Sequence, residues 1–306
     1  MSAPSIAENA AAVGGPVVAA PQEKRPGRPG RTVGLAAIYV LLVALVVVFL
    51  GPIVFIVLNS FKQKFSISSD PFAVPVGDMW AGFSNYITGL TKQNFLEAIG
   101  WSFFITVASV GVIVFFCAMM AYYITRIKTW WTTALYYLLV FSMVIPFQMV
   151  MFPTVKLADM LSLSNPLGMV VLYLGFGAGL SVFIFSGFVK SIPLEIEEAA
   201  YIDGCSPVQT YFQVVFPILK PVSITVAILN AMWVWNDYLL PYLVIGLSTR
   251  FKTIPVVVQQ FVGSNGNRDM GTMMAMLVLA VIPIVIFYLF AQKHIIEGVV
   301  AGSVKG

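Results

Sequence analysis

Charged residues are scarce in this sequence, and their scarcity excludes the ordinary classes of soluble protein. Only 10% of the 306 residues are Asp, Glu, Lys or Arg, whereas 59% are apolar. Ordinary soluble domains have roughly 25% charged and 45–50% apolar residues. The composition therefore indicates a protein that lies largely within a membrane.

Residues that build disulfide bonds, metal centres and catalytic sites are also rare. Cys117 and Cys205 are too far apart in the expected topology to suggest a disulfide bond. The one histidine, His294, follows the last apolar run beside Lys293, as is typical of side chains at a membrane surface. The sequence shows no pattern of metal ligands, of a nucleophile with its base, or of a G-x-x-x-x-G-K-[ST] phosphate loop. We expect no catalytic residue, no metal and no bound cofactor, and a membrane-embedded enzyme is the least favoured class.

Long apolar runs fill the space between the charged residues. A helix needs about 20 apolar residues to cross the hydrocarbon core, and six runs are long enough. Asp237 is the one charged residue inside any of them. A transmembrane barrel would instead show alternating segments of about ten residues. The predicted fold class is all-α, a polytopic membrane protein with six transmembrane helices. The runs lie between Arg31 and Lys62, Glu97 and Arg126, Lys128 and Lys156, Asp159 and Lys190, Lys220 and Arg250, and Asp269 and Lys293.

The first 32 residues predict a disordered basic tail. They are rich in Ala, Pro and Gly and end with Lys24, Arg25, Arg28 and Arg31. A cleaved signal is less favoured, because the following apolar run exceeds the roughly 7–15 residues of a signal core. Basic residues beside a span favour the cytoplasmic side, so both termini are expected there. Contact with anionic lipid explains a pI near 9.0 without a nucleic-acid partner.

The connection of residues 60–96 is the longest polar segment expected on the external side. Trp80, Phe83 and Tyr86 are spread through it, so we expect it to pack on the spans as a cap. A connection of this length is usually ordered or functional. The sequence leaves open whether it is a docking surface for an external partner or a structural cap alone.

The polar segment between the fourth and fifth runs predicts a helix, a bend and a second helix. Ser191 and Pro193 are expected to start the first helix, and Gly204 to stop it. Ser206 and Pro207 have the residue types that start a second helix.

The middle of the first of these two helices has the features of a docking surface. Ala199 and Ala200 would let another surface approach the backbone closely, and Glu198 and Asp203 would offer carboxylates to basic groups. Glu195 and Glu197, with Glu198, complement the positive end of the helix dipole. An ordinary interfacial amphipathic helix is the less favoured interpretation.

This segment resembles the cytoplasmic signature of permease subunits of ATP-binding-cassette (ABC) importers, a Glu-Ala-Ala run, then Asp-Gly, then Leu-Pro or similar. The resemblance implies the ABC importer permease fold over residues 33–306, with a coupling loop at about 190–218 that inserts a short helix into a separate ATPase subunit. The implied ATPase-coupling residues are Glu198, Ala199, Ala200, Asp203 and Gly204. The matching residues are Glu198-Ala199-Ala200, Asp203-Gly204 and Phe216-Pro217.

Further stretches resemble the carbohydrate-importing branch, and within it the second permease of maltose-type systems. They are Trp235-Asn236-Asp237-Tyr238 with Pro241, Asn85-Tyr86, and the tail from Gly298 to Gly306. The resemblance implies a subunit of a sugar or oligosaccharide importer in a prokaryotic cell membrane. The implied partners are a second permease, an ABC ATPase dimer that binds ATP and Mg, an extracytoplasmic solute-binding protein, a sugar substrate and membrane lipid. It leaves open an ABC permease for a non-sugar solute.

The fifth run contains the candidate substrate path, consisting of Trp233, Trp235, Asn236, Asp237 and Tyr238. Aromatic faces beside polar groups suit stacking on a sugar and hydrogen bonding to it. The alternative is structural, with both tryptophans packed on a neighbouring helix and the aspartate paired near the outer interface. An ion-coupled secondary transporter, the main rival class, normally has ionisable residues deep in the membrane, and only the aspartate qualifies.

Overall fold

The computed structural model describes residues 29–92, 94–247, 249–261 and 269–303, and their regular structure is helical apart from one isolated β-bridge between Lys62 and Trp80. The chain divides into two compact units, residues 1–52 and 53–306, which are described separately. Residues 1–28 of the predicted tail lie outside the described residues. Its last four residues are helical instead, because helix α1 (Pro29–Ser60) begins at a proline, which is favoured in the first turn of a helix.

Helix α1 supplies the first predicted span. The stretch from Gly34 to Ser60 contains no charged residue, and 18 consecutive residues within it have a mean hydropathy of 3.3. At 1.5 Å per residue, its 27 residues extend about 40 Å, more than the roughly 30 Å of the hydrocarbon core.

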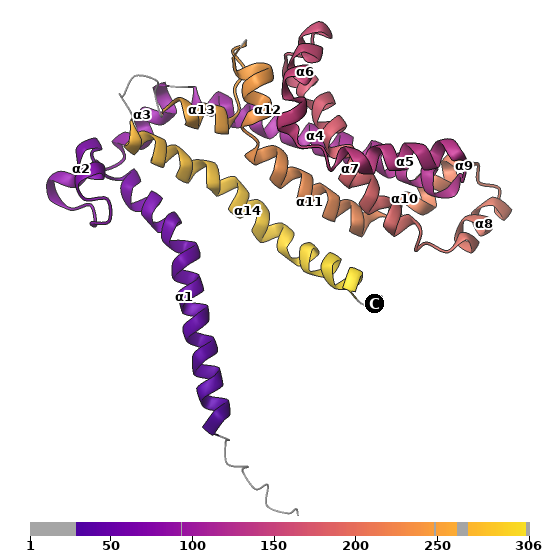
Figure 1. Ribbon diagram of the computed structural model, residues 1–306, viewed down its shortest axis with the longest axis horizontal. Coiled ribbons are helices and arrows are strands. Elements are labelled where there is room, and N and C mark those ends of the chain that lie inside the picture. The colour runs from indigo at the N-terminus through magenta and orange to yellow at the C-terminus, as the bar shows by residue number, and fades with distance from the viewer. Residues whose placement is uncertain (1–28, 93, 248, 262–268, 304–306) are drawn as a thin grey trace, which may run out of the picture. The chain divides into compact units, whose positions relative to one another are not determined.

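The second unit is built around the helix α4 (Phe95–Arg126), which packs most extensively against α7 (Pro166–Val189) and also against α11 (Lys220–Asn236). Helix α5 (Trp130–Ser142) packs on α7, and α14 (Met270–Ser303) packs on α11 (Figure 1).

Two of the six predicted spans are pairs of helices that meet at a sharp bend. Helices α5 and α6 (Phe147–Met160) meet at 108°, and the helical segment Pro207–Ile218 meets α11 at 72°. Pro146 precedes α6 and Pro221 lies in the first turn of α11, and proline disfavours a continuing helix before it. Among the described residues, four helices are long and apolar enough to span a membrane, and there are six spans if each bent pair is one.

The fifth apolar run also ends earlier as a helix than predicted. Helix α11 stops at Asn236, because Asp237 is extended, with φ −71° and ψ 125°. The chain continues through the short helix α12 (Leu239–Pro241) and the π-helix η3 (Tyr242–Gly246). Helix α13 (Ile254–Gln260) follows and packs on α4 and α14.

The connection between α1 and α4 is a folded cap, as predicted. It contains α2 (Lys64–Ser69), the 3-10 helix η1 (Gly77–Met79) and α3 (Ser84–Lys92), and α3 packs on α14. Asn85 Nδ2 donates hydrogen bonds to the carbonyl oxygens of Ser60 (2.8 Å) and Lys62 (2.9 Å). These bonds join the start of α3 to the end of α1. That the cap also docks an external partner stays a prediction.

We predict that Gly179→Ala destabilises the contact between α7 and α5. A Cβ atom at Gly179 would lie 2.6 Å from the carbonyl oxygen of Leu139 and 2.8 Å from Met143 Cγ, so the helices must shift apart. Overpacking of this kind costs about 1–3 kcal/mol. The thermal unfolding midpoint of the purified chain should fall. Gly187→Ala on the same helix, where a Cβ meets no atom within 4 Å, should not lower it, because alanine favours a helix more than glycine does. Equal midpoints for the two variants would contradict the packing argument.

Candidate functional site

The predicted docking segment is a helix, a bend and a second helix. Helix α8 (Leu194–Ile202) is followed by α9 (Pro207–Gln209), the π-helix η2 (Thr210–Val215) and α10 (Phe216–Ile218). The start of α8 differs from the prediction. Pro193 occupies the N-cap position, and Ser191 Oγ donates to the carbonyl oxygen of Phe188 (2.7 Å), so the serine caps no helix.

Gly204 makes the bend, as the sequence indicated. Its φ of +86° lies in the left-handed region, which glycine adopts without steric cost. The backbone amide of Cys205 donates to the carbonyl oxygen of Ala200 (2.9 Å) and closes the end of α8. After the bend, Ser206 and Gln209 form a reciprocal capping box at the start of α9, which confirms the predicted second start.

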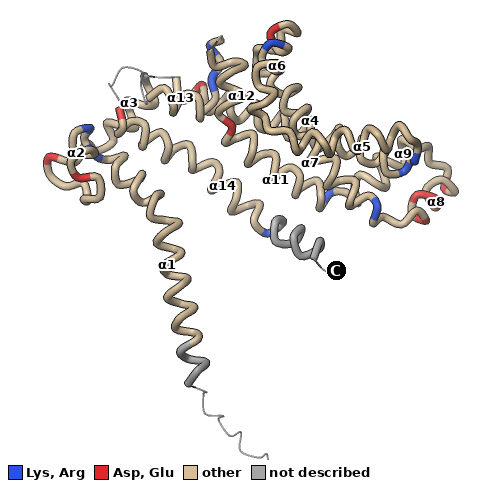
Figure 2. Tube along the Cα trace, viewed as in Figure 1, with Lys and Arg blue, Asp and Glu red and all other residues tan. Residues whose placement is uncertain are grey.

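Helix α8 has one face turned outward and one turned toward the rest of the chain. Glu198, Ala199, Asp203 and Gly204 are exposed, and Ile202 is 87% exposed. Figure 2 shows acidic residues gathered at α8, whereas the long helices are almost free of charge. Ala200 is only 7% exposed. Ala200 therefore packs within this chain, and Ala199 is the alanine of the pair that lies on the exposed face.

The carboxylate of Glu197, expected only to complement the helix dipole, is instead buried against another helix. Glu197 is 5% exposed and forms an ion pair with Arg126 at 2.6 Å. Its Oε1 accepts from Arg126 Nε (2.7 Å), and its Oε2 accepts from the hydroxyl of Tyr122 (2.8 Å). The sequence offered no signal for this pair, because 71 residues separate its members and no local periodicity connects them.

The candidate substrate path contains an anchored carboxylate. Asp237 Oδ2 accepts a hydrogen bond from the hydroxyl of Tyr173 on α7 (3.0 Å), and Oδ1 accepts from the backbone amide of Leu239 (3.0 Å). Tyr173 is fully buried. The aspartate therefore ties the end of α11 to α7 and caps the turn that follows, which fits the structural alternative.

The two tryptophans of this cluster pack on neighbouring helices. The ring of Trp233 lies edge-on to Tyr173 with centroids 5.4 Å apart, and Trp235 Nε1 donates to the carbonyl oxygen of Ala280 on α14 (3.4 Å). Tyr238 stacks on Tyr242 at 5.1 Å. Asn236 is exposed. The described contacts thus give the tryptophans packing partners and leave the amide side chain accessible.

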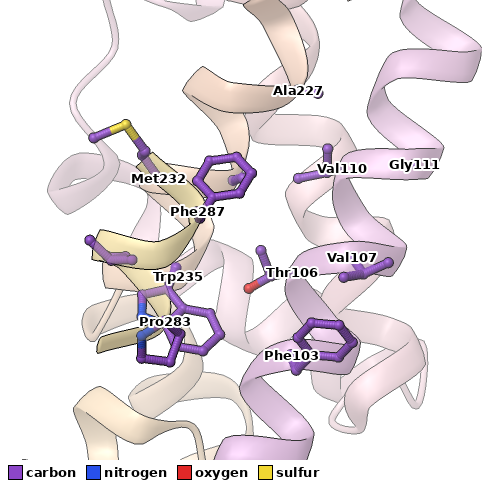
Figure 3. A pocket seen from close by; sticks show the side chains of 12 residues that line it. Phe103, Thr106, Val107, Val110, Gly111, Ala227, Met232, Trp235, Pro283 and Phe287 are labelled. Atoms are coloured by element: carbon purple, nitrogen blue, oxygen red, sulfur yellow. The ribbon is translucent and has the colours of Figure 1, made fainter. Parts of the chain in front are cut away.

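Trp235 borders two cavities of different character. One, of about 370 Å³, lies between α4, α11 and α14, and its lining is apolar apart from Thr106 and the indole nitrogen of Trp235 (Figure 3). The other, of about 440 Å³, is lined by Trp235, Asn236 and Tyr238 together with Gln259 and apolar residues of α13 and α14. The second cavity offers the aromatic and amide groups that suit a polar solute.

The sequence and the fold place this chain among known transport proteins. Residues 113–300 match the family described as binding-protein-dependent transport system inner membrane component. The chain belongs to this family of permeases, and it is a multi-pass membrane protein. The predicted class, a permease subunit of an ABC importer, is confirmed.

Named relatives cover most of the chain. It is 37% identical over 263 residues to the probable starch degradation products transport system permease protein AmyC of Thermoanaerobacterium thermosulfurigenes, covering 86% of this chain and 94% of that protein. It is 35% identical over 274 residues to the multiple sugar-binding transport system permease protein MsmG of Streptococcus mutans, covering 87% and 96%.

A solved structure shares the fold. The chain matches a component of a bacterial ABC transporter involved in the import of the acidic polysaccharide alginate, with a TM-score of 0.74 and 23% identity, over 88% of this chain and 98% of the other. The expected ABC importer permease fold is therefore confirmed. The coupling role of Glu198, Ala199, Ala200, Asp203 and Gly204 and the substrate-path role of the cluster around Trp235 stay predictions.

We predict that the bend at Gly204 depends on backbone conformation and not on lack of space. A Cβ atom there would meet nothing within 4 Å, so Gly204→Ala suffers only the left-handed strain of about 1–2 kcal/mol. Amide hydrogen exchange at Cys205 should accelerate by roughly 5–30-fold, the factor that such a free energy gives. Gly204→Asn should exchange more slowly than Gly204→Ala, because asparagine tolerates this conformation. Equal exchange in both variants would contradict the proposed cause.

We also predict that Tyr173→Phe destabilises the junction of α7 with α11. The substitution removes the hydroxyl that donates to Asp237 and leaves a partly buried carboxylate oxygen without that donor. The expected loss in the free energy of unfolding is about 1–3 kcal/mol. Chemical unfolding of the detergent-solubilised chain measures it, with Tyr137→Phe, at a side chain that is 66% exposed, as the matched control. A loss no larger than that of the control would show that the hydrogen bond contributes little.

Proposed function

We propose that this chain is one of the two permeases of an ATP-driven sugar or oligosaccharide importer in a prokaryotic cell membrane. A second permease would complete the translocation path, an ABC ATPase dimer would bind ATP and Mg, and an extracytoplasmic solute-binding protein would deliver the sugar. The observation that carries the proposal is the signature formed by Glu-Ala-Ala on α8 and Asp-Gly in the bend after it, with Glu198, Asp203 and Gly204 exposed.

The sugar substrate is supported by the relatives. Two of them are named for starch degradation products and for multiple sugars, and each is at least 35% identical to this chain over more than four fifths of its length. The transporter with the similar fold is described as importing alginate, another carbohydrate polymer.

Helix α8 suits contact with a separate ATPase. Its outer face combines an apolar side chain, Ile202, with the carboxylates of Glu198 and Asp203, so a cleft with apolar walls and a basic rim would complement it. Arg126, Lys190 and Lys220 lie at the ends of the helices nearest to this segment, which favours the cytoplasmic side for it. We propose the same side for both termini.

Coupling would then follow from differential binding. If the closed ATPase dimer binds one conformation of the permeases better than the other, ATP binding shifts their populations and alternates access to the path. The cavity of about 440 Å³ beside Trp235, Asn236 and Tyr238 is the candidate part of that path in this chain. In this proposal Asp237 shapes the path through its bond to Tyr173 and does not hold the sugar.

The test is to purify the tagged chain in mild detergent, identify the proteins that accompany it, and measure ATP hydrolysis and sugar uptake after reconstitution. We expect a second permease and an ATPase to accompany it. Glu198→Lys should reduce recovery of the ATPase by about tenfold or more, because charge reversal at an interface costs several kcal/mol. Asp78→Lys, the same charge change at an exposed residue of the cap, should leave recovery unchanged.

Two outcomes would overturn parts of this proposal. A chain purified without an ATPase that still moves solute along an ion gradient would favour a secondary transporter. A complete complex that hydrolyses ATP and takes up a non-sugar solute, but none of a panel of oligosaccharides, would retain the coupling and reject the substrate.

A further inference from the structure

Helix α8 is attached to the rest of the chain by very few buried groups. The non-helical residues 190–193 precede it and 203–206 follow it, and within 190–206 only Ile192, Glu197 and Ala200 are buried. One isoleucine and one alanine bury little apolar surface. Helix α8 also packs on η2, and the polar contacts of Glu197 add a separate attachment to α4.

The polar contacts of Glu197 are all made with side chains of the last turn of α4. Arg126 is the final residue of that helix, and Tyr122 lies four residues earlier, so both side chains emerge on the same face. Each binds a different carboxylate oxygen of Glu197. Arg126 Nη2 also donates to the carbonyl oxygen of Ile192 (3.0 Å), so one guanidinium group holds both α8 and the connection before it.

The geometry of the contact resists sliding and rotation. A planar guanidinium with several donors fixes the direction of its partner in a way that an apolar contact does not. The group is also shielded, since the side chains of Arg126 and Glu197 are 15% and 7% exposed. An apolar pair of similar volume would often be as stable, so stability alone does not account for burying these charges.

The helix at the other end of this contact is central to the bundle. Helix α4 packs on α7 and α11, and it contributes Phe103, Thr106 and Val107 to the cavity of about 370 Å³. We infer that Glu197 is a positioning residue that locks α8 to Arg126 and Tyr122, so that a displacement of α8 by the ATPase moves α4 and is not absorbed by the loops around α8. This inference rests on the proposed function.

The test uses the complete complex and follows α4 by the labelling rate of a cysteine. Val107→Cys places a thiol on α4 at an exposed position of the cavity lining. Of the two native cysteines, Cys205 is replaced by serine so that it does not react, and Cys117 is buried. The maleimide labelling rate is measured with and without ATP and vanadate, together with ATP hydrolysis and recovery of the ATPase. We expect ATP to change the rate at least about fivefold, the lower end of usual coupling between sites.

Glu197→Gln should leave the ATPase bound and active and make the labelling rate independent of ATP. Glu195→Gln, which removes an exposed carboxylate from the same helix, should keep the ATP effect. Tyr122→Phe keeps the ion pair and removes one hydrogen bond, so it should reduce the effect in part. It also tests the inference if Glu197→Gln fails to assemble.

The possible results separate the inference from the proposed function. If no ATPase accompanies the unsubstituted chain, the proposed function fails. If the ATPase is bound and active but ATP leaves the labelling rate unchanged, or if Glu197→Gln and Tyr122→Phe both keep the full ATP effect, the inference alone is overturned. An equal loss in Glu195→Gln and Glu197→Gln would also overturn it.

Discussion

A backbone amide in the hydrocarbon core of a membrane has no water to bind, and this constraint governs most of the structure. Helices satisfy it within one segment, which is why the long apolar stretches of this chain are helical. Some polar side chains inside the bundle use their hydrogen bonds to join helices. Asn230, for example, donates to the carbonyl oxygen of Val226 (2.9 Å) and to Ser181 Oγ (3.1 Å), so a buried amide joins α11 to α7.

The same constraint explains where the helices break. Prolines lack an amide hydrogen, so the ends of helices near Pro146 and Pro221 forfeit fewer hydrogen bonds than a break elsewhere would. At the end of α11, Asp237 accepts from the backbone amide of Leu239 and so replaces part of the interrupted ladder. The residue that looked most like an ion or sugar ligand is thus used in joining helices.

The two candidate sites lie in parts of the fold with different burial. The segment around α8 is exposed on its outer face and held on its inner face by a shielded ion pair. The cluster around Trp235 lies among packed helices and borders both an apolar and a mixed cavity. A protein partner needs the first kind of surface, and a small polar solute needs the second. This division agrees with the proposed subunit, which would connect an ATPase outside the membrane to a translocation path inside it.

The sequence by itself determined the class of protein, the number of apolar runs, the helix, bend and helix of the docking segment, and the glycine at its turn. These features depend on composition, on local backbone preference and on short motifs, all of which are local properties of the chain. Only the tertiary structure decided that Ala200 and Glu197 face inward, that Arg126 and Tyr122 hold the carboxylate, and that Tyr173 binds Asp237. Those contacts join residues 64 to 75 positions apart, and they depend on how α4, α7 and α11 pack, which no local pattern in one sequence specifies.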